Sequence, residues 1–262
     1  MKLKESNDAA KSSLLSRGNF IAKVGSALFA ASALTAGCSA GLNNAQKHQS
    51  KGRKSSKIKQ WDVITIGNLS RNRYWGESDD KGVRSTLCTT TLITGDGFRI
   101  LVDPSLADAA QMKHELDRRT GVKPQDVTAV FVTHEHPDHF EGIAHFPDAR
   151  WLAAPAVAEI LNKSGKLPRA LEGCSDELFD AVEVIPTPGH THAHHSLVFD
   201  CAGLRIVVAG DSAITQDFFR DRRGYRNAVD FELSTRTIDK LAAVADIIIP
   251  GHDNFFFADY VG

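Results

Sequence analysis

A cluster of side chains with the chemistry of metal ligands lies near the middle of this 262-residue chain. It follows the apolar run 129–132 and places four ligand-type residues within six positions, namely His134, His136, Asp138 and His139. Imidazole nitrogens combined with carboxylate oxygens suit zinc, manganese or iron, whereas purely structural zinc sites prefer thiolates. The H-x-H-x-D-H spacing can direct some of these side chains to one point and the others to a neighbouring point. The sequence therefore predicts a metal centre here.

Three further ligand-type residues occur in a similar setting. His190, Asp211 and His252 each follow a glycine in a turn that closes an apolar run. Side chains at strand ends often gather on one edge of a sheet and form a site on a rigid base. A single histidine is more often a core or surface residue, but the repeated setting favours a centre with two metal ions. His192, His194 and His195 are expected near this centre without being ligands.

The segments between these residues alternate between strand and helix patterns. Apolar, β-rich runs predict strands at residues 61–67, 86–94, 98–102, 127–132, 182–185, 196–200, 204–209 and 246–249. Amphipathic or helix-forming runs predict helices at 107–119, 155–163 and 231–244. A long polar loop is expected at 68–85 and an irregular insertion at 164–180. Two β-rich halves with intervening helices indicate an α+β sandwich of sheets covered by helices.

The first 60 residues have the composition of an export signal and a tether. Residues 1–38 combine a basic start, a short apolar run and small residues at the end, which is typical of a secretory signal peptide. The apolar run is too short for a comfortable membrane span. An ordinary N-terminal helix is the alternative. Residues 39–60 are polar and basic and predict a disordered linker, so the folded domain is expected at 61–262.

Two local patterns concern the export route. Residues 16–23 resemble a twin-arginine signal, although Gly18 occupies the position of the second arginine. Residues 35–38 resemble a bacterial lipoprotein cleavage site with Cys38 as the lipidated residue. The expected location is therefore the periplasm or the membrane surface, with a membrane tether through the N-terminus. The basic linker would then either touch anionic lipid headgroups or remain solvated.

Charge and cysteine content exclude some classes of protein. Residues 1–60 hold 11 Lys and Arg against 2 Asp and Glu, which leaves 20 basic and 30 acidic residues in 61–262. An acidic domain disfavours nucleic acid as a partner, because such binding depends on basic patches. Cys38, Cys88, Cys174 and Cys201 form no C-x-x-C pair, so neither a cysteine zinc ribbon nor a disulfide scaffold is expected.

The ligand motifs taken together resemble those of the metallo-β-lactamase-fold hydrolase superfamily over residues 61–262. This resemblance implies an αββα four-layer sandwich in which two β-sheets are flanked by helices. It also implies one metal on His134, His136 and His190, a second on Asp138, His139 and His252, and Asp211 as the bridge. Asp103, after the strand 98–102, matches a family position that supports the metal loops. The complete set is more similar to the glyoxalase II, lactonase and nuclease branches than to β-lactamases of clinical type.

The expected function is an exported, dinuclear, metal-dependent hydrolase of a small ester, lactone, thioester or amide. Two divalent ions, Zn²⁺ first with Mn²⁺ or Fe²⁺ as alternatives, would share a hydroxide nucleophile. Asp138 is the candidate to hold and pass the proton. A nuclease (phosphodiesterase) of the same fold, a di-iron oxygen-using enzyme and a non-catalytic binding protein remain as alternatives.

Substrate choice is expected to depend on two loops. The first offers Tyr74 and Trp75, and the second, 218–226, offers Arg222, Arg223 and Tyr225. The arginines are predicted to accept a carboxylate or phosphate of the substrate at the mouth of the site. The alternative is a solvated loop that balances local acidic residues.

Overall fold

A computed structural model describes residues 57–258, and within this range the chain forms two six-stranded mixed sheets. The first sheet contains, in spatial order, β1 (Ile58–Thr65), β2 (Thr90–Gly95), β3 (Phe98–Val102), β4 (Ala129–Val132), β5 (Arg150–Ala153) and β6 (Glu172–Gly173). The second contains β12 (Phe256–Phe257), β11 (Ile247–Pro250), β10 (Leu204–Gly210), β9 (His195–Cys201), β8 (Val182–Pro186) and β7 (Glu177–Leu178).

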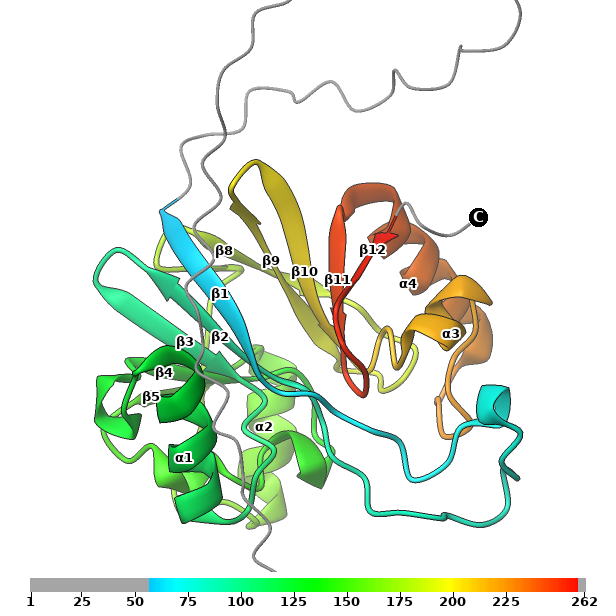
Figure 1. Ribbon diagram of the computed structural model, residues 1–262, viewed down its shortest axis with the longest axis horizontal. Coiled ribbons are helices and arrows are strands. Elements are labelled where there is room, and N and C mark those ends of the chain that lie inside the picture. The colour runs from blue at the N-terminus through cyan, green and yellow to red at the C-terminus, as the bar shows by residue number, and fades with distance from the viewer. Residues whose placement is uncertain (1–56, 259–262) are drawn as a thin grey trace, which may run out of the picture. The chain divides into compact units, whose positions relative to one another are not determined.

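Helices cover the outer side of each sheet (Figure 1). The first sheet is covered by α1 (Ala109–Thr120) and α2 (Pro155–Ser164), and the second by α3 (Gln216–Arg220) and α4 (Phe231–Val244). Short 3-10 turns complete the described chain at Arg73–Trp75 (η1), Pro124–Asp126 (η2), Pro137–His139 (η3) and Ile143–His145 (η4). The order helix, sheet, sheet, helix confirms the predicted αββα sandwich.

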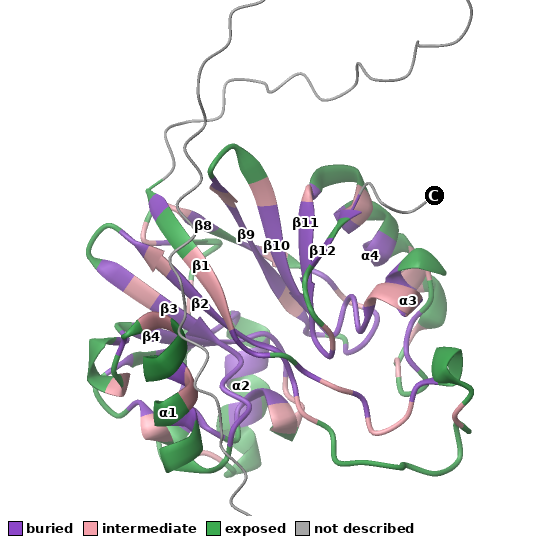
Figure 2. Cartoon of the chain, viewed as in Figure 1, coloured by how far each residue is buried: buried purple, intermediate pink, exposed green. Residues whose placement is uncertain are grey.

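The central strands of the second sheet, β9, β10 and β11, are buried on both faces, as β10 illustrates. Ile206 and Val208 belong to the apolar core that also contains Ile100 and Val130 of the first sheet. Their neighbours Val207 and Ala209 belong instead to a separate apolar cluster with Ile238 and Leu241 of α4. Side chains alternate between the faces of a strand, so one run of apolar residues fills both layers. Figure 2 shows β9, β10 and β11 buried over most of their length and the outer helix faces exposed.

The strand directions bring the ends that precede the ligand motifs to one edge of each sheet. In the first sheet β3 and β4 are parallel, and in the second β10 and β11 are parallel. β8 pairs antiparallel with β9, which pairs antiparallel with β10, so β8 and β10 end at the same edge. Loops at the carboxyl ends of these strands therefore meet between the two sheets.

The predicted helices form where local signals start and stop them. The side chain of Asp108 accepts a hydrogen bond from Gln111 N–H at the start of α1, and Gly121 ends that helix with φ 70°. The side chain of Asp230 caps α4 in the same way through Leu233 N–H. The bounds of α4 are those predicted, and the two predicted hairpins are also confirmed as β2–β3 and β9–β10.

The structure differs from the prediction at several edges. β1 begins at Ile58, which is buried and pairs with Gly95, so the sheet starts before the predicted boundary at residue 61. The segment 164–180, predicted to be irregular, contains the short strands β6 and β7. Three elements outside this segment, β5, α3 and β12, were also not predicted. Several of these elements are too short to show a periodic pattern. The predicted signal peptide and Cys38 lie outside the described residues, and no described helix is long and apolar enough to cross a membrane.

Candidate metal centre

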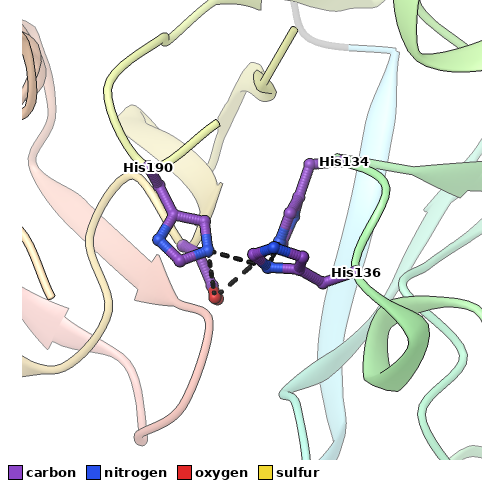
Figure 3. A group of neighbouring side chains, drawn as sticks. His134, His136 and His190 are labelled. Atoms are coloured by element: carbon purple, nitrogen blue, oxygen red, sulfur yellow. Dashed lines mark hydrogen bonds and ion pairs between the residues drawn. The ribbon is translucent and has the colours of Figure 1, made fainter. Parts of the chain in front are cut away.

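The first group of ligand-type side chains comes from three separate loops. His134 and His136 follow β4, His190 lies between β8 and β9, and Asp211 follows β10. One ligand atom from each of the four lies within 4.8 Å of the others. His136 Nδ1 is 3.0 Å from His134 Nε2 and 2.9 Å from His190 Nε2. Figure 3 shows the rings of His134 and His136 turned toward that of His190, which approaches from the opposite loop.

A second group lies beside the first. It consists of Asp138 and His139, which are in the turn η3, and His252, which follows β11. His252 Nε2 lies 3.6 Å from Asp138 Oδ2. The side chains of His139 and His252 are 0% and 2% exposed, whereas that of Asp138 is 25% exposed. The second group therefore has one carboxylate that solvent can reach.

The carboxylate of Asp211 faces both groups. Its Oδ2 lies 3.1 Å from His190 Nε2 and 3.8 Å from His134 Nε2. Its Oδ1 lies 3.2 Å from His139 Nε2 and 3.2 Å from His252 Nε2. The structure thus brings all seven predicted ligands together and places Asp211 between the two sets.

Asp103 holds the loop that carries the cluster. Its Oδ1 accepts a 2.8 Å hydrogen bond from Thr133 N–H, and its Oδ2 accepts bonds of 2.8 Å from the Thr133 hydroxyl and 2.9 Å from His139 Nδ1. Asp103 itself is 1% exposed and has φ 50°, a region that non-glycine residues seldom adopt. Its geometry agrees with the supporting role that the sequence assigned to it.

Hydrogen bonds to the Nδ1 atoms leave three Nε2 atoms free to act as ligands. His139 Nδ1 bonds to Asp103, and His252 Nδ1 lies 2.9 Å from the carbonyl oxygen of Leu87. The Thr133 hydroxyl donates to Asp103, so it accepts from His134 Nδ1 at 3.1 Å. With the proton on Nδ1, the lone pair of Nε2 points into the cluster, which is the arrangement found around metal-binding histidines.

Several buried polar atoms in the cluster have no hydrogen-bond partner within the described residues. They include His139 Nε2, His190 Nδ1 and Asp211 Oδ1. Leaving such atoms unpaired is costly, because they have lost their contact with water. A divalent cation beside His139 Nε2 and Asp211 Oδ1 would satisfy both atoms. The residues therefore fit metal ions, and the cluster can hold them.

Burial and mutual charge shift the pKa values of the cluster in opposite directions. Burial lowers the pKa of His134 well below its ordinary value, and it also lowers the pKa of His136. Burial opposes the charged form of His139 and His252 as well, but nearby acidic groups, Asp211 among them, outweigh it and raise both pKa values. The same histidines hold the pKa of Asp211 well below its usual range, in spite of burial. Without metal, protons on His139 and His252 therefore neutralise this carboxylate.

A cavity of about 380 Å³ opens onto the cluster. His136, Asp138, Asp211 and His252 form its polar end. The remaining wall is formed by Leu69, Ser70, Thr86, Pro137, Glu141, Ile214, Tyr225, Arg226 and Asn227. Tyr225, a predicted substrate residue, lies in this wall, and Arg226 lines the cavity although the sequence did not single it out.

Four of the five predicted substrate residues do not line this cavity. The hydroxyl of Tyr74 donates to Asp221, and its ring packs edge-on against Phe218 at 4.9 Å. Trp75 lies under the guanidinium of Arg84 at 5.3 Å. Neither side chain lines the cavity of the metal cluster, so the structure gives no support to substrate contacts by the first loop.

The two predicted arginines lie in different places. Arg222 Nε pairs with Asp239 Oδ1 at 3.2 Å, and its guanidinium lies 5.0 Å from the centre of the Phe219 ring, so it faces α4. Arg223 lines a smaller neighbouring cavity of about 190 Å³. Neighbouring arginines of this loop therefore face different surroundings. The number of charges in the sequence does not reveal which arginine faces which.

Two buried residues beside the ligands were given no specific position by the sequence. The ring of His194 stacks on that of His134 at 4.8 Å, and its Nδ1 bonds to the Thr187 hydroxyl at 2.9 Å. Cys88 Sγ donates to the carbonyl oxygen of Asp103 at 3.4 Å, and burial raises the pKa of this thiol to about 12. All three cysteines in the described range are free. His194 shared the histidine-rich setting of His190, but nothing local marked Cys88.

Comparison with known proteins gives the family. The profile of the metallo-beta-lactamase superfamily matches residues 84–252, which include every predicted ligand. The chain belongs to the metallo-β-lactamase superfamily. It is 33% identical to metallo-beta-lactamase domain-containing protein 1 of Xenopus laevis over 175 residues. The aligned segment covers 63% of this chain and 70% of that protein. Membership identifies the chain as a metallo-hydrolase of this superfamily and leaves its substrate open.

Two further superfamily members illustrate the range of its relatives. A hydroxyacylglutathione hydrolase of Xylella fastidiosa is 33% identical over 124 residues, which are 47% of this chain and 43% of that protein. The crystal structure of a quorum-quenching N-acyl homoserine lactone lactonase superposes with a TM-score of 0.61 at 22% identity, covering 76% of this chain and 94% of that one. The second comparison supports the fold of the superfamily.

Proposed function

We propose that this metallo-hydrolase is dinuclear and cleaves a small ester, lactone, thioester or amide. The observation that carries the proposal is the position of Asp211, whose two oxygens face two different sets of histidines. His134, His136 and His190 would hold one divalent ion, and Asp138, His139 and His252 the other. Zinc suits this set of nitrogen and oxygen ligands, and manganese and iron are the alternatives. Two such ions, when bound, polarise a carbonyl and supply a water of lowered pKa.

The protein's own residues orient the reacting groups and move protons. Asp103 and Thr133 fix the loop, so the imidazoles keep their lone pairs directed at the cluster. Asp138 is the acidic ligand exposed to the cavity, at 25% of its side chain against 4% for Asp211. A carboxylate at this boundary can accept a proton from the attacking water and return it to the leaving group. We therefore assign proton transfer to Asp138.

The cavity supports a small-molecule substrate. A volume of about 380 Å³ lies in the range of ordinary ligand pockets. The name of the Xylella relative records hydrolysis of an acylglutathione, which is a thioester, and the matched segment is similar over 124 residues. A thioester is therefore the first substrate to examine, with esters and lactones next.

A hydrolysis panel on the zinc-loaded full chain tests this function. It contains a glutathione thioester, an aryl ester, an N-acyl lactone, a β-lactam and a DNA phosphodiester. We expect turnover of at least one of the first four and a loss of more than about 100-fold in Asp138→Asn. The matched control, Asp96→Asn, changes an exposed carboxylate that pairs with Lys59 and should retain full activity. A protein that carries two metals and cleaves only the phosphodiester, or nothing, would contradict the proposal.

We also propose that the chain is exported, on the basis of its first 38 residues. Cys38 would carry the lipid, and residues 39–56 would connect it to the sheet. Expression in a bacterial host should place the wild type in the membrane fraction and Cys38→Ala in the soluble periplasmic fraction. Recovery of both proteins in the cytoplasm with residues 1–38 intact would refute export.

A further inference from the structure

Arg226 lies on the wall between two cavities. It lines the 380 Å³ cavity of the metal cluster, where it is the only lysine or arginine among the lining residues of the described chain. It also lines the adjacent 190 Å³ cavity together with Arg73 and Arg223. Arg226 thus borders both the cavity that contains Asp138 and His252 and a smaller cavity bordered by two more guanidinium groups.

The loop that carries Arg226 is attached to the metal loop and to η1. Val229 N–H donates to the His190 carbonyl at 3.2 Å, which joins the loop to a predicted ligand. The buried ring of Tyr225 packs against Phe218 at 5.4 Å, and its hydroxyl donates to the Arg71 carbonyl at 3.0 Å. Figure 1 shows the η1 segment beside the loop between α3 and α4. These bonds fix the position of the Arg226 backbone relative to the cluster.

The smaller cavity has an excess of positive charge, because most acidic residues near it are paired with other groups. Asp221 accepts from the Tyr74 hydroxyl, and Asp239 pairs with Arg222. Asp79 is the one carboxylate that lines the smaller cavity, against three guanidinium groups. No ion pair within residues 57–258 joins Arg73, Arg223 or Arg226 to a carboxylate. This concentration of arginine is unusual in a domain whose residues 61–262 hold 20 basic and 30 acidic side chains.

We propose that Arg226, Arg223 and Arg73 form a subsite for an anionic group at the end of the substrate remote from the bond that is cleaved. The group is a carboxylate or a phosphate, because the planar guanidinium donates paired hydrogen bonds to both. Phe218 and Phe231 line the same cavity and would contact the apolar part of that end. This inference rests on the proposed hydrolysis of a small acyl compound and narrows its substrates to acidic ones.

Three thioesters with the same acyl group test the subsite by kinetics. S-acetyl-N-acetylcysteamine is neutral, S-acetylglutathione carries carboxylates, and S-acetyl-4′-phosphopantetheine carries a phosphate. The measured quantity is the preference for the anionic substrate, which is kcat/KM for the better anionic thioester divided by kcat/KM for the neutral one. In the zinc-loaded full chain, Arg226→Gln should lower this ratio about tenfold, mainly by raising KM for the anionic thioester. Arg222→Gln, the matched control in the same loop, should leave that ratio unchanged. Asp79→Asn should raise it, because it removes the competing carboxylate.

A binding measurement separates the subsite from the reaction. Calorimetry with S-methylglutathione and S-methyl-4′-phosphopantetheine, which are thioethers and have no thioester bond, should show a Kd about tenfold weaker for Arg226→Gln than for the wild type or Arg222→Gln. If no thioester is cleaved but this difference appears, the subsite stands and the proposed thioester reaction fails. The subsite is overturned if neither thioether binds the wild type, or if Arg226→Gln and Arg222→Gln behave alike in both measurements.

Discussion

Asp211 Oδ1 and His139 Nε2 lie 3.2 Å apart in a buried site, and neither atom has a hydrogen-bond partner within the described residues. The two groups form an ion pair when His139 carries both ring protons. In the neutral ring the single proton goes to Asp103, and the Nε2 lone pair then faces Asp211 Oδ1. Two buried ligand atoms that face the same space without bonding each other indicate a shared third partner, and a divalent cation fits that description.

Replacement of Asp211 tests whether one carboxylate serves both positions. Asp211→Asn keeps the size of this buried side chain and removes its charge, so affinity should fall for both ions and activity by more than about 100-fold. Metal analysis after dialysis should show loss from both positions. Retention of one firmly bound ion with normal affinity would show that Asp211 belongs to a single position.

Replacement of Asp103 tests its effect on the ligands that it holds. Asp103→Asn weakens the hydrogen bonds to Thr133 and His139, so the affinity of the second position should fall by about 10- to 100-fold. Competition with a chelator measures this change. Unaltered metal affinity in a folded Asp103→Asn protein would mean that the ligand loop is held by other contacts.

Gly251 is required by the close approach of Asp211. A Cβ atom at this position would overlap Asp211 Oδ1, so Gly251→Ala should displace the carboxylate and reduce metal content and activity together. Gly82→Ala is the control, because its nearest contact would be Ser70 Cβ at 3.4 Å, an ordinary packing distance. Equal metal content in the two variants would contradict the predicted effect.

The pKa shifts predict how the stability of the metal-free protein depends on pH. The lowered pKa values of His134 and His194 mean that the unfolded state binds more protons below pH 6.5, so stability should fall as the pH decreases. The raised pKa values of His139 and His252 mean that the folded state binds more protons above pH 6.5, so stability should also fall as the pH increases. Stability should therefore be greatest near pH 6.5.

Thermal unfolding of chelator-treated protein across pH 5–9 measures this dependence. Metal loading should remove the decline on the alkaline side, because the ions replace the protons that neutralise Asp211. His114→Gln, at an exposed position on α1, should leave the profile unchanged. A metal-free protein whose Tm rises steadily from pH 6.5 to 9 would show that the protons on His139 and His252 do not stabilise it.

The ligands could be predicted from the sequence because each one is encoded locally. Four of them follow an apolar strand directly, the other three follow a strand and a turn with glycine, and parallel strands then bring these segments to one edge. The same logic explains why the hairpin β2–β3 and the helix α4 were predicted. Asp103, which follows β3 directly, was assigned through the family resemblance.

The substrate wall could not be predicted in this way, because contacts between distant segments shape it. The bonds of Tyr225 to Arg71 and of Val229 to His190 hold the loop segment that carries Arg226. The ion pair with Asp239 directs Arg222 to α4. Likewise, Asp221 attracts the hydroxyl of Tyr74 from 147 positions away along the chain. The sequence showed that arginines gather in this loop, but it could not show which of them reach the site.

The two-metal account is tested most directly by anomalous diffraction from crystals of the zinc-loaded protein, with data collected above and below the zinc absorption edge. The account predicts two peaks about 3.5–4 Å apart. One should lie among His134, His136, His190 and Asp211 Oδ2, and the other among Asp138, His139, His252 and Asp211 Oδ1. A single peak, or peaks that do not contact Asp211, would contradict it.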